Sequence, residues 1–164
     1  MEPLPLHANA RAVADAAARL GLELDVREFP DGTRTAEDAA RAIGVDVGQI
    51  VKSLVFAVGD DLVVALVSGP NRLDEGRLAE AAGRAGTPVG RVDAGRVRDA
   101  TGYAIGGTPP FGYPGPVRRV VDRDLLAHDE VWAAAGTPRH VFGVRPEELV
   151  RVTAGTVAPL RAPS

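Results

Sequence analysis

Residues 51–68 read VKSLVFAVGDDLVVALVS, two apolar runs separated by a short polar turn. The runs at 51–58 and 62–68 are rich in Val, a residue type that suits strands, and Gly59-Asp60-Asp61 forms a connection of hairpin length. Both runs are apolar on both faces, which is typical of strands that are covered on both sides. We therefore expect this hairpin to lie at the centre of a sheet.

Lys52 interrupts the first of these runs. It is the one lysine of the chain, in which the other eighteen of nineteen basic residues are Arg. Strand side chains alternate, so Lys52 shares a face with Leu54 and Phe56 and stands at the edge of an apolar surface. An ammonium there is costly unless it is paired or reaches water. Two interpretations stay open: a lysine that snorkels over the open end of a core, or a cation placed to meet an anion or a developing negative charge.

The segments around the hairpin show helical and extended patterns, and the strands occur in sequence-adjacent pairs. This order favours an α+β fold with a mixed or antiparallel sheet. We expect a helix at 10–20, capped by Asn9 and ended at Gly21, and a second helix that is capped by Thr35 and ends near Gly44. The other predicted elements are a strand at 22–27, a turn at 30–32, a helix at 73–82, a short strand near 89, a helical turn near 97, strands at 117–122, 131–135 and 141–144, a helix led by Pro146 and a final strand at 149–153.

The length and composition of the chain bound its class. It has 164 residues, of which 45% are hydrophobic and 25% charged. Such a chain is typically one globular domain, so we expect a single domain over 1–164, with a loose tail over about 158–164. The net charge of −3 argues against a broad basic face, and DNA is not an expected partner. A few local Arg residues would still suffice to recognise a nucleic-acid end.

Several kinds of site are missing from the sequence. Cysteine is absent, and the histidines His7, His128 and His140 lie far apart. The chain therefore lacks a thiol nucleophile and the spacing of a helical zinc motif, and we expect neither a metal nor another cofactor. No stretch reaches the roughly 18 apolar residues of a membrane span, and the first residues lack the features of a signal peptide. We expect no membrane partner and a cytoplasmic location.

A glycine pair lies in the segment TGYAIGGTPPFG, residues 101–112. Glycine lets the backbone approach a ligand closely, and unencumbered amides donate to an oxyanion or phosphate. A tight, rigid turn at a corner of the sheet is the alternative interpretation of this loop. Its candidate site residues are Gly106, Gly107 and Thr108.

Ser68 and Asn71 follow the second strand of the hairpin. They contact a ligand in one interpretation and cap the following helix in the other. No Ser-His-Asp or Cys-His spacing is present, and Asp60-Asp61 resembles a pair of turn residues. A hydrolase built on this sequence would therefore depend on positioning and backbone donors more than on a protein nucleophile.

Three segments, taken in order, resemble the YbaK/ProX family of free-standing aminoacyl-tRNA deacylases, which is related to the editing domain inserted in bacterial prolyl-tRNA synthetases. They are QIVKSLVF at 49–56, LVSG at 66–69 and TGYAIGGTPP at 101–110. The resemblance covers residues 10–157 and includes the helix start at Thr35 and the block DEVWAAAG at 129–136. It implies an α+β fold with a mixed, largely antiparallel, barrel-like sheet, flanking helices and a pocket at one end.

The same resemblance implies a trans-editing hydrolase, which cleaves the ester of a small amino acid such as Ala or Cys wrongly attached to tRNA for proline. Lys52 matches the family's strand lysine, associated with the terminal nucleotide and the reacting ester, and Gly106 matches the glycine whose amide helps to position the aminoacyl carbonyl. Water is the attacking group, assisted by the ribose hydroxyl of the substrate or, for Cys, by its side chain. The implied partners are the 3′ end of aminoacyl-tRNA and a prolyl-tRNA synthetase. The candidates for substrate binding are Thr35, Ser68, Asn71, Gly107 and Thr108.

The sequence departs from the family near the pocket. Position 141, which is polar in some members, is Val141, with His140 beside it. The amino acid that is removed does not follow from the resemblance, because hydrophobic pockets discriminate weakly by one methylene. Two alternatives to the hydrolase stay open: a non-catalytic module that binds aminoacyl-tRNA or a regulator in the same pocket, and a Schiff-base enzyme that uses Lys52 on a carbonyl substrate.

Overall fold

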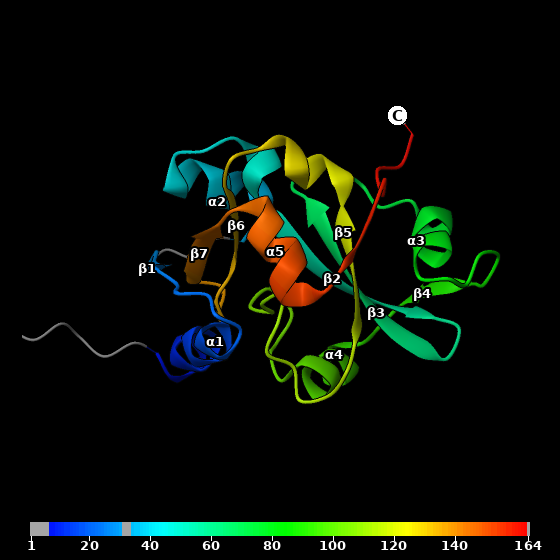
Figure 1. The fold of residues 1–164 in the computed structure, drawn as a ribbon, viewed down its shortest axis with the longest axis horizontal. Coiled ribbons are helices and arrows are strands. Elements are labelled where there is room, and N and C mark those ends of the chain that lie inside the picture. The colour runs from blue at the N-terminus through cyan, green and yellow to red at the C-terminus, as the bar shows by residue number, and fades with distance from the viewer. Residues whose placement is uncertain (1–6, 31–33, 164) are drawn as a thin grey trace, which may run out of the picture.

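The predicted hairpin is the centre of the structure, a computed structural model that describes residues 7–30 and 34–163. Strands β2 (Val51–Val58) and β3 (Asp61–Ser68) pair antiparallel along their whole length. Strand β4 (Val89–Arg91) joins the outer edge of β2, so that the five-stranded sheet has the order β4-β2-β3-β5-β8. Both strands of the hairpin are interior strands, as their apolar faces predict (Figure 1).

The other half of this sheet is parallel. Strand β5 (Arg118–Asp122) runs parallel to β3, and β8 (Thr156–Ala158) runs parallel to β5. A second sheet has the order β1-β7-β6 and is antiparallel, with β1 at Val26–Glu28, β6 at Val131–Ala134 and β7 at His140–Val144. One parallel bridge, between Ile50 and Trp132, connects the two sheets. The predicted α+β fold with a mixed sheet is confirmed, although the sheets do not close into a barrel.

Helices cover both faces of the hairpin (Figure 1). One face packs with α1 (Ala8–Arg19) and α5 (Pro146–Thr153) in a core that includes Leu66, Phe142 and Leu149. The other face packs with α3 (Glu75–Ala81) through Val67, Leu78 and Leu160. The remaining helices are α2 (Ala36–Ile43), α4 (Ala94–Thr101) and the 3-10 helices η1 (Val47–Gln49) and η2 (Arg123–Ala127).

Some predicted ends of elements are wrong. Helix α1 is capped by His7, whose Nδ1 accepts a hydrogen bond from the Asn9 amide at 3.1 Å, because the Asn9 side chain donates to the Gly136 carbonyl instead. The extended segment at 22–27 forms a strand only from Val26. Helix α3 begins at Glu75, where Asp74 provides the cap. Of the turn at 30–32, Asp31 and Gly32 lie outside the described residues.

The final strand is also displaced from its predicted place at 149–153. Those residues belong to α5, because Pro146 stands at the helix start and Leu149 and Val152 are spaced by three residues on its buried face. The last strand is β8. Residues 158–162, which we expected to be loose, are held against α3: Leu160 is fully buried, its carbonyl accepts from the Asp74 amide, and the Ala162 amide donates to the Arg72 carbonyl.

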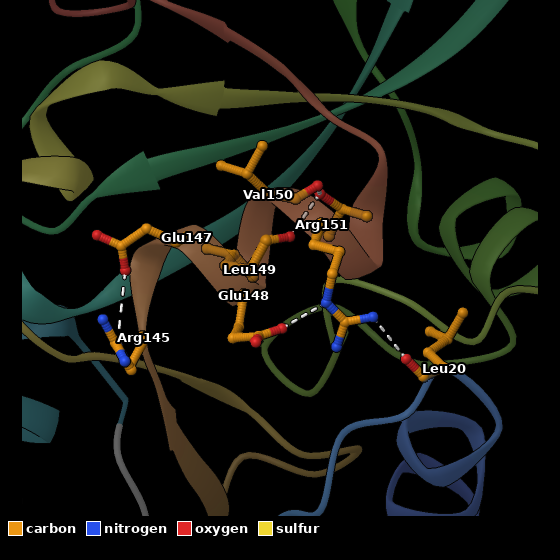
Figure 2. Close-up of polar contacts among 8 residues, drawn as sticks. Leu20, Arg145, Glu147, Glu148, Leu149, Val150 and Arg151 are labelled. Atoms are coloured by element: carbon orange, nitrogen blue, oxygen red, sulfur yellow. Dashed lines mark hydrogen bonds and ion pairs between the residues drawn. The ribbon is translucent and has the colours of Figure 1, made fainter.

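Arg151 ties α5 to the end of α1. Its Nε donates to the Glu148 carboxylate at 2.5 Å, and its Nη1 donates to the Leu20 carbonyl at 2.8 Å (Figure 2). Leu20 is the residue that follows the last turn of α1, where helix carbonyls lack partners within the helix. One side chain thus joins the first and last helices. None of the helices in the described part of the chain is long and apolar enough to cross a membrane.

Candidate active site

A cavity of about 460 Å³ lies where the two sheets separate. Strand β2 pairs with β4 only through residues 56–58. Along the same edge, the first half of β2 pairs with no other strand of the described residues, and beside it lies only the bridge between Ile50 and Trp132. The start of β2, the beginning of α2, the glycine loop at 105–108 and strand β6 surround the space that this leaves. Four residues of the predicted site line it: Thr35, Lys52, Gly106 and Thr108.

Lys52 brings a half-buried cation to this cavity. Its Nζ donates to the main-chain carbonyl of Asn71 at 2.6 Å. Burial lowers the pKa of Lys52, while the negative charges of Glu37 and Asp122 act in the opposite direction and favour the ammonium. The side chain therefore neither snorkels freely into water nor lies unpaired in the core.

Ser68 and Asn71 stand behind Lys52, outside the lining of the cavity. The Ser68 hydroxyl donates to the Gly48 carbonyl at 2.7 Å. The Asn71 side chain donates to the carboxylates of Asp122 and Asp124, at 2.9 and 2.8 Å. Neither residue caps α3, because Asp74 does so. Both side chains are thus turned towards protein partners.

The glycine loop forms the opposite wall. Gly106 has a φ of +89°, in the region that favours glycine, and no hydrogen bond of its amide is found within the described part of the chain. The Ala104 carbonyl accepts both the Gly107 amide, at 3.1 Å, and the Thr108 hydroxyl, at 3.0 Å. These two bonds fix the turn, and neither of them uses the amide of Gly106.

Gly107 has a packing role. A Cβ atom on it would lie 2.8 Å from Cα of Thr137 and 2.9 Å from the Gly136 carbonyl oxygen, closer than real contacts allow. The loop therefore rests directly on the backbone at 136–137. Because Gly107 is buried and does not line the cavity, its side of the turn supports the loop while Gly106 faces the space.

Helix α2 adds charge to the cavity. The Thr35 hydroxyl accepts from the Asp38 amide at 3.0 Å, so it is used as the helix cap although the residue lines the cavity. Arg34 and Glu37 also line the cavity and had not been singled out from the sequence. The signal for Glu37 was ambiguous, because acidic residues are common in the first turn of any helix. Only the arrangement of α2 opposite Lys52 shows that this carboxylate faces a cation.

Val141 lines the cavity, whereas its neighbour His140 does not. His140 is buried; its Nε2 lies 3.1 Å from the Glu28 carboxylate, and its Nδ1 lies 2.6 Å from the Thr137 hydroxyl. It therefore connects β1 to the turn on which Gly107 rests. The cavity wall at this point is apolar and also includes Ile50, Trp132, Ala133 and Ala134.

Two further observations favour this cavity as the candidate site. A larger depression, of about 660 Å³, lies at the tip of the hairpin near Asp60 and Arg84, and none of the predicted site residues lines it. Among residues 7–30 and 34–163 there is no group of three or more side chains placed to hold a metal ion. The cavity beside Lys52 is the place where the predicted cation and the predicted glycine loop meet.

Comparison with known proteins agrees with this geometry. The profile of the aminoacyl-tRNA editing domain matches residues 30–152, and the chain belongs to this family. Protein YwhH of Bacillus subtilis, which is uncharacterized, is 30% identical over 128 residues, 77% of this chain and 80% of that protein. A proline–tRNA ligase of Thermoanaerobacter is 30% identical over 97 residues, but the match covers 59% of this chain and only 17% of the ligase.

Solved structures share the fold over almost the whole chain. The crystal structure of a "putative trans-editing enzyme for prolyl tRNA synthetase" is 45% identical, with a TM-score of 0.90, and the match covers 97% of this chain and 100% of that one. The hypothetical protein APE2540 is 31% identical, with a TM-score of 0.83, and covers 92% of this chain and 99% of its own. The predicted relation to the editing domain of prolyl-tRNA synthetase is confirmed.

Proposed function

We propose that this protein is a free-standing hydrolase that removes a wrongly attached small amino acid from the 3′ end of tRNA for proline, acting in the cytoplasm as a single editing domain. The observation that carries the proposal is that Lys52 and Gly106 line the same cavity of about 460 Å³. This volume lies within the range of small-molecule sites, about 300–1,000 Å³. Membership of the editing family and the relation to prolyl-tRNA synthetase support the substrate class.

The reaction needs no covalent intermediate with the protein. Water adds to the ester carbonyl carbon, the bond from that carbon to the ribose oxygen breaks, and the ribose oxygen takes up a proton. The products are the free amino acid and a tRNA with its terminal hydroxyl restored. The ribose hydroxyl beside the ester, or the thiol of a cysteinyl substrate, is placed to assist the water.

In this reaction Gly106 donates its amide to the ester carbonyl oxygen, on which negative charge develops. Lys52 supplies the positive charge that holds the terminal nucleotide and the ester in place. A bound ester is held in one orientation more firmly when the protein pairs the charged groups of the substrate with opposite charges. The carboxylate of Glu37, in the cavity wall, therefore pairs with the α-ammonium of the aminoacyl group.

The wall of the cavity favours a small side chain on the substrate. Ala36, Ala39, Ala133, Ala134 and Val141 present apolar surface in one part of the lining, which elsewhere contains polar residues such as Ser53 and Thr108. Alanine and cysteine suit such a surface. Serine and threonine, which would lose hydrogen bonds to water there, are expected to react more slowly.

The test is a deacylation panel with tRNA for proline charged with Ala, Cys, Ser, Thr or Pro. The wild type should hydrolyse the Ala or Cys ester well above the spontaneous rate, and Lys52→Ala should lower kcat/KM by about 100-fold or more, as expected for a misplaced ester. Lys52→Arg tests whether charge alone suffices. A wild type that binds the charged tRNA without cleaving any ester would replace the hydrolase with a binding module, and a borohydride-trapped adduct at Lys52 would favour the Schiff-base enzyme.

A further inference from the structure

Among the residues that the structure describes, one carbonyl, that of Asn71, accepts a hydrogen bond from the Lys52 ammonium. This carbonyl belongs to the turn that follows β3, in which the Asn71 amide donates to the Ser68 carbonyl at 2.9 Å. The Asn71 side chain is only 8% exposed, and its amide nitrogen donates to two carboxylates. Because the residue is held at both its main chain and its side chain, the position of its carbonyl is fixed.

Asp122 is the centre of this arrangement. It is fully buried at the end of β5. Its Oδ2 accepts from the Ser68 amide, at 3.0 Å, and from the Asn71 side chain, while its Oδ1 accepts from the Asp124 amide at 3.1 Å. A buried carboxylate is costly unless such donors surround it, and here three N–H groups do so.

The charge of Asp122 also reaches Lys52 electrostatically. Glu37 on α2 and Asp122 on β5 both favour the ammonium, against the burial that lowers its pKa. Within the described residues, further charged or titratable groups in this region include Arg34, which shares the cavity, Asp124 on η2, which bonds Asn71, and His128, whose ring lies beside Gly48. Of the two carboxylates that favour the cation, Asp122 is fully buried and Glu37 is exposed.

We propose that Asn71 and Asp122 are positioning residues for Lys52: Asn71 fixes the ammonium through its main-chain carbonyl, and Asp122 holds Asn71 in place and supplies the buried counter-charge. The inference rests on the proposed function only in that the ammonium is the cation of the active cavity. It gives Ser68 and Asn71 a role behind the cavity wall, where they organise Lys52 without touching the substrate.

The test uses the fact that Lys52 is the one lysine of the chain. Protein that is labelled with ¹³C and ¹⁵N in lysine gives a single side-chain ammonium signal, which reports the pKa of Lys52 and the exchange of its protons with water. In Asp122→Asn the loss of a nearby negative charge disfavours the charged form. The Lys52 pKa should therefore fall below its wild-type value, and the ammonium protons should exchange faster.

Activity gives a second, separate readout. In Asp122→Asn, kcat/KM on the charged tRNA should fall by about 10- to 100-fold, as expected for a misplaced catalytic group. The alkaline limb of the pH profile of kcat/KM should lie at lower pH in Asp122→Asn than in the wild type, because Lys52 loses its proton at a lower pH in the variant. A merely structural role for Asp122 would lower stability without moving this limb.

A pair of milder variants covers the case in which Asp122→Asn does not fold. Asn71→Ala removes the side-chain clamp, and Asp124→Ala removes only the partner of Asn71 that is partly exposed. Exchange of the Lys52 protons should quicken clearly in Asn71→Ala and little in Asp124→Ala. Unchanged Lys52 pKa and exchange in folded Asn71→Ala or Asp122→Asn would overturn the proposal, whatever the activity. An inactive wild type with the expected NMR changes would instead leave the positioning intact and refute the hydrolase.

Discussion

At the level of single residues, the candidate site depends on two groups with opposite requirements. Lys52 needs a protein environment that tolerates a half-buried cation, which the Asn71 carbonyl and the nearby carboxylates provide. Gly106 needs a backbone conformation that other residues adopt only at a cost, and it offers an amide with no hydrogen-bond partner in the described chain. Both requirements can be tested by single substitutions.

Gly106→Ala has a matched control in Gly102→Ala. The two glycines have φ values of +89° and +86°, and an added Cβ would meet only ordinary contacts at either position, at 3.8 and 3.9 Å. Each substitution should therefore cost about 1 kcal/mol of the free energy of unfolding. Deacylation should fall by about 100-fold in Gly106→Ala alone, because the strain turns the amide away from the ester. Urea unfolding measures the loss of stability, and kcat/KM measures the loss of activity. Equal activities of the two variants would show that the Gly106 amide takes no part in the reaction.

Glu37→Gln tests recognition of the α-ammonium. The substitution keeps the size of the side chain and removes its charge, so kcat/KM for the aminoacyl ester should fall by about 10-fold, the size expected for a lost charge-assisted hydrogen bond. The control is a substrate whose amino group is acetylated and neutral, on which wild type and variant should perform alike. A similar loss on both substrates would show that Glu37 acts through Lys52 instead.

At the level of elements, the sequence predicts the hairpin, the α2 cap and the glycine loop well, because each depends on local patterns. The apolar runs at 51–58 and 62–68 identify β2 and β3 within one residue, and Thr35 and Gly44 bound α2 as predicted. The prediction of the last strand is wrong, because the short stretch LVRVT at 149–153, with three apolar residues, fits a strand and a buried helix face equally well. The clamp of Asn71 by Asp122 was not predicted, because it joins residues 51 apart in the sequence.

Gly69, which follows the last residue of β3, lies against η1, and its substitution tests how closely these two elements pack. A Cβ atom on it would lie 2.2 Å from the Val47 carbonyl oxygen, so Gly69→Ala must displace backbone and should destabilise the protein by about 2 kcal/mol or more. The control is Gly90→Ala in β4, where nothing lies within 4 Å of the added atom. It should unfold at nearly the wild-type urea concentration. Equal midpoints for the two variants would contradict the packing described here.

At the level of the whole molecule, specific contacts hold the first helix and the C-terminal segment of the described chain in place. Arg151 joins α5 to the end of α1, and Leu160 closes the core beneath α3 (Figure 2 shows the first contact). These contacts explain why the expected loose tail is not observed at 158–162. They also mean that stability depends on residues far from the cavity.

Leu160→Ala measures that dependence. The side chain is fully buried, so its truncation should lower the free energy of unfolding by about 2–5 kcal/mol and lower Tm accordingly. The neighbouring Arg161→Ala, at an exposed position, should change it by less than about 0.5 kcal/mol. Below the Tm of Leu160→Ala, deacylation should stay near the wild-type rate. A loss of activity in a fully folded variant would show that the tail influences the cavity.

The cavity exists because the first half of β2 parts from its neighbour, and this opening has a consequence for solubility. A strand edge with free backbone donors and acceptors is a template for pairing with another chain, and proteins protect such edges with charges or with a covering helix. Here Lys52 lies on the strand itself and α2 lies across the opening. Lys52 and α2, which line the cavity, therefore lie at a strand edge that would otherwise be open to pairing, and variants that remove the charge or loosen the helix should make the protein more prone to aggregate through β2.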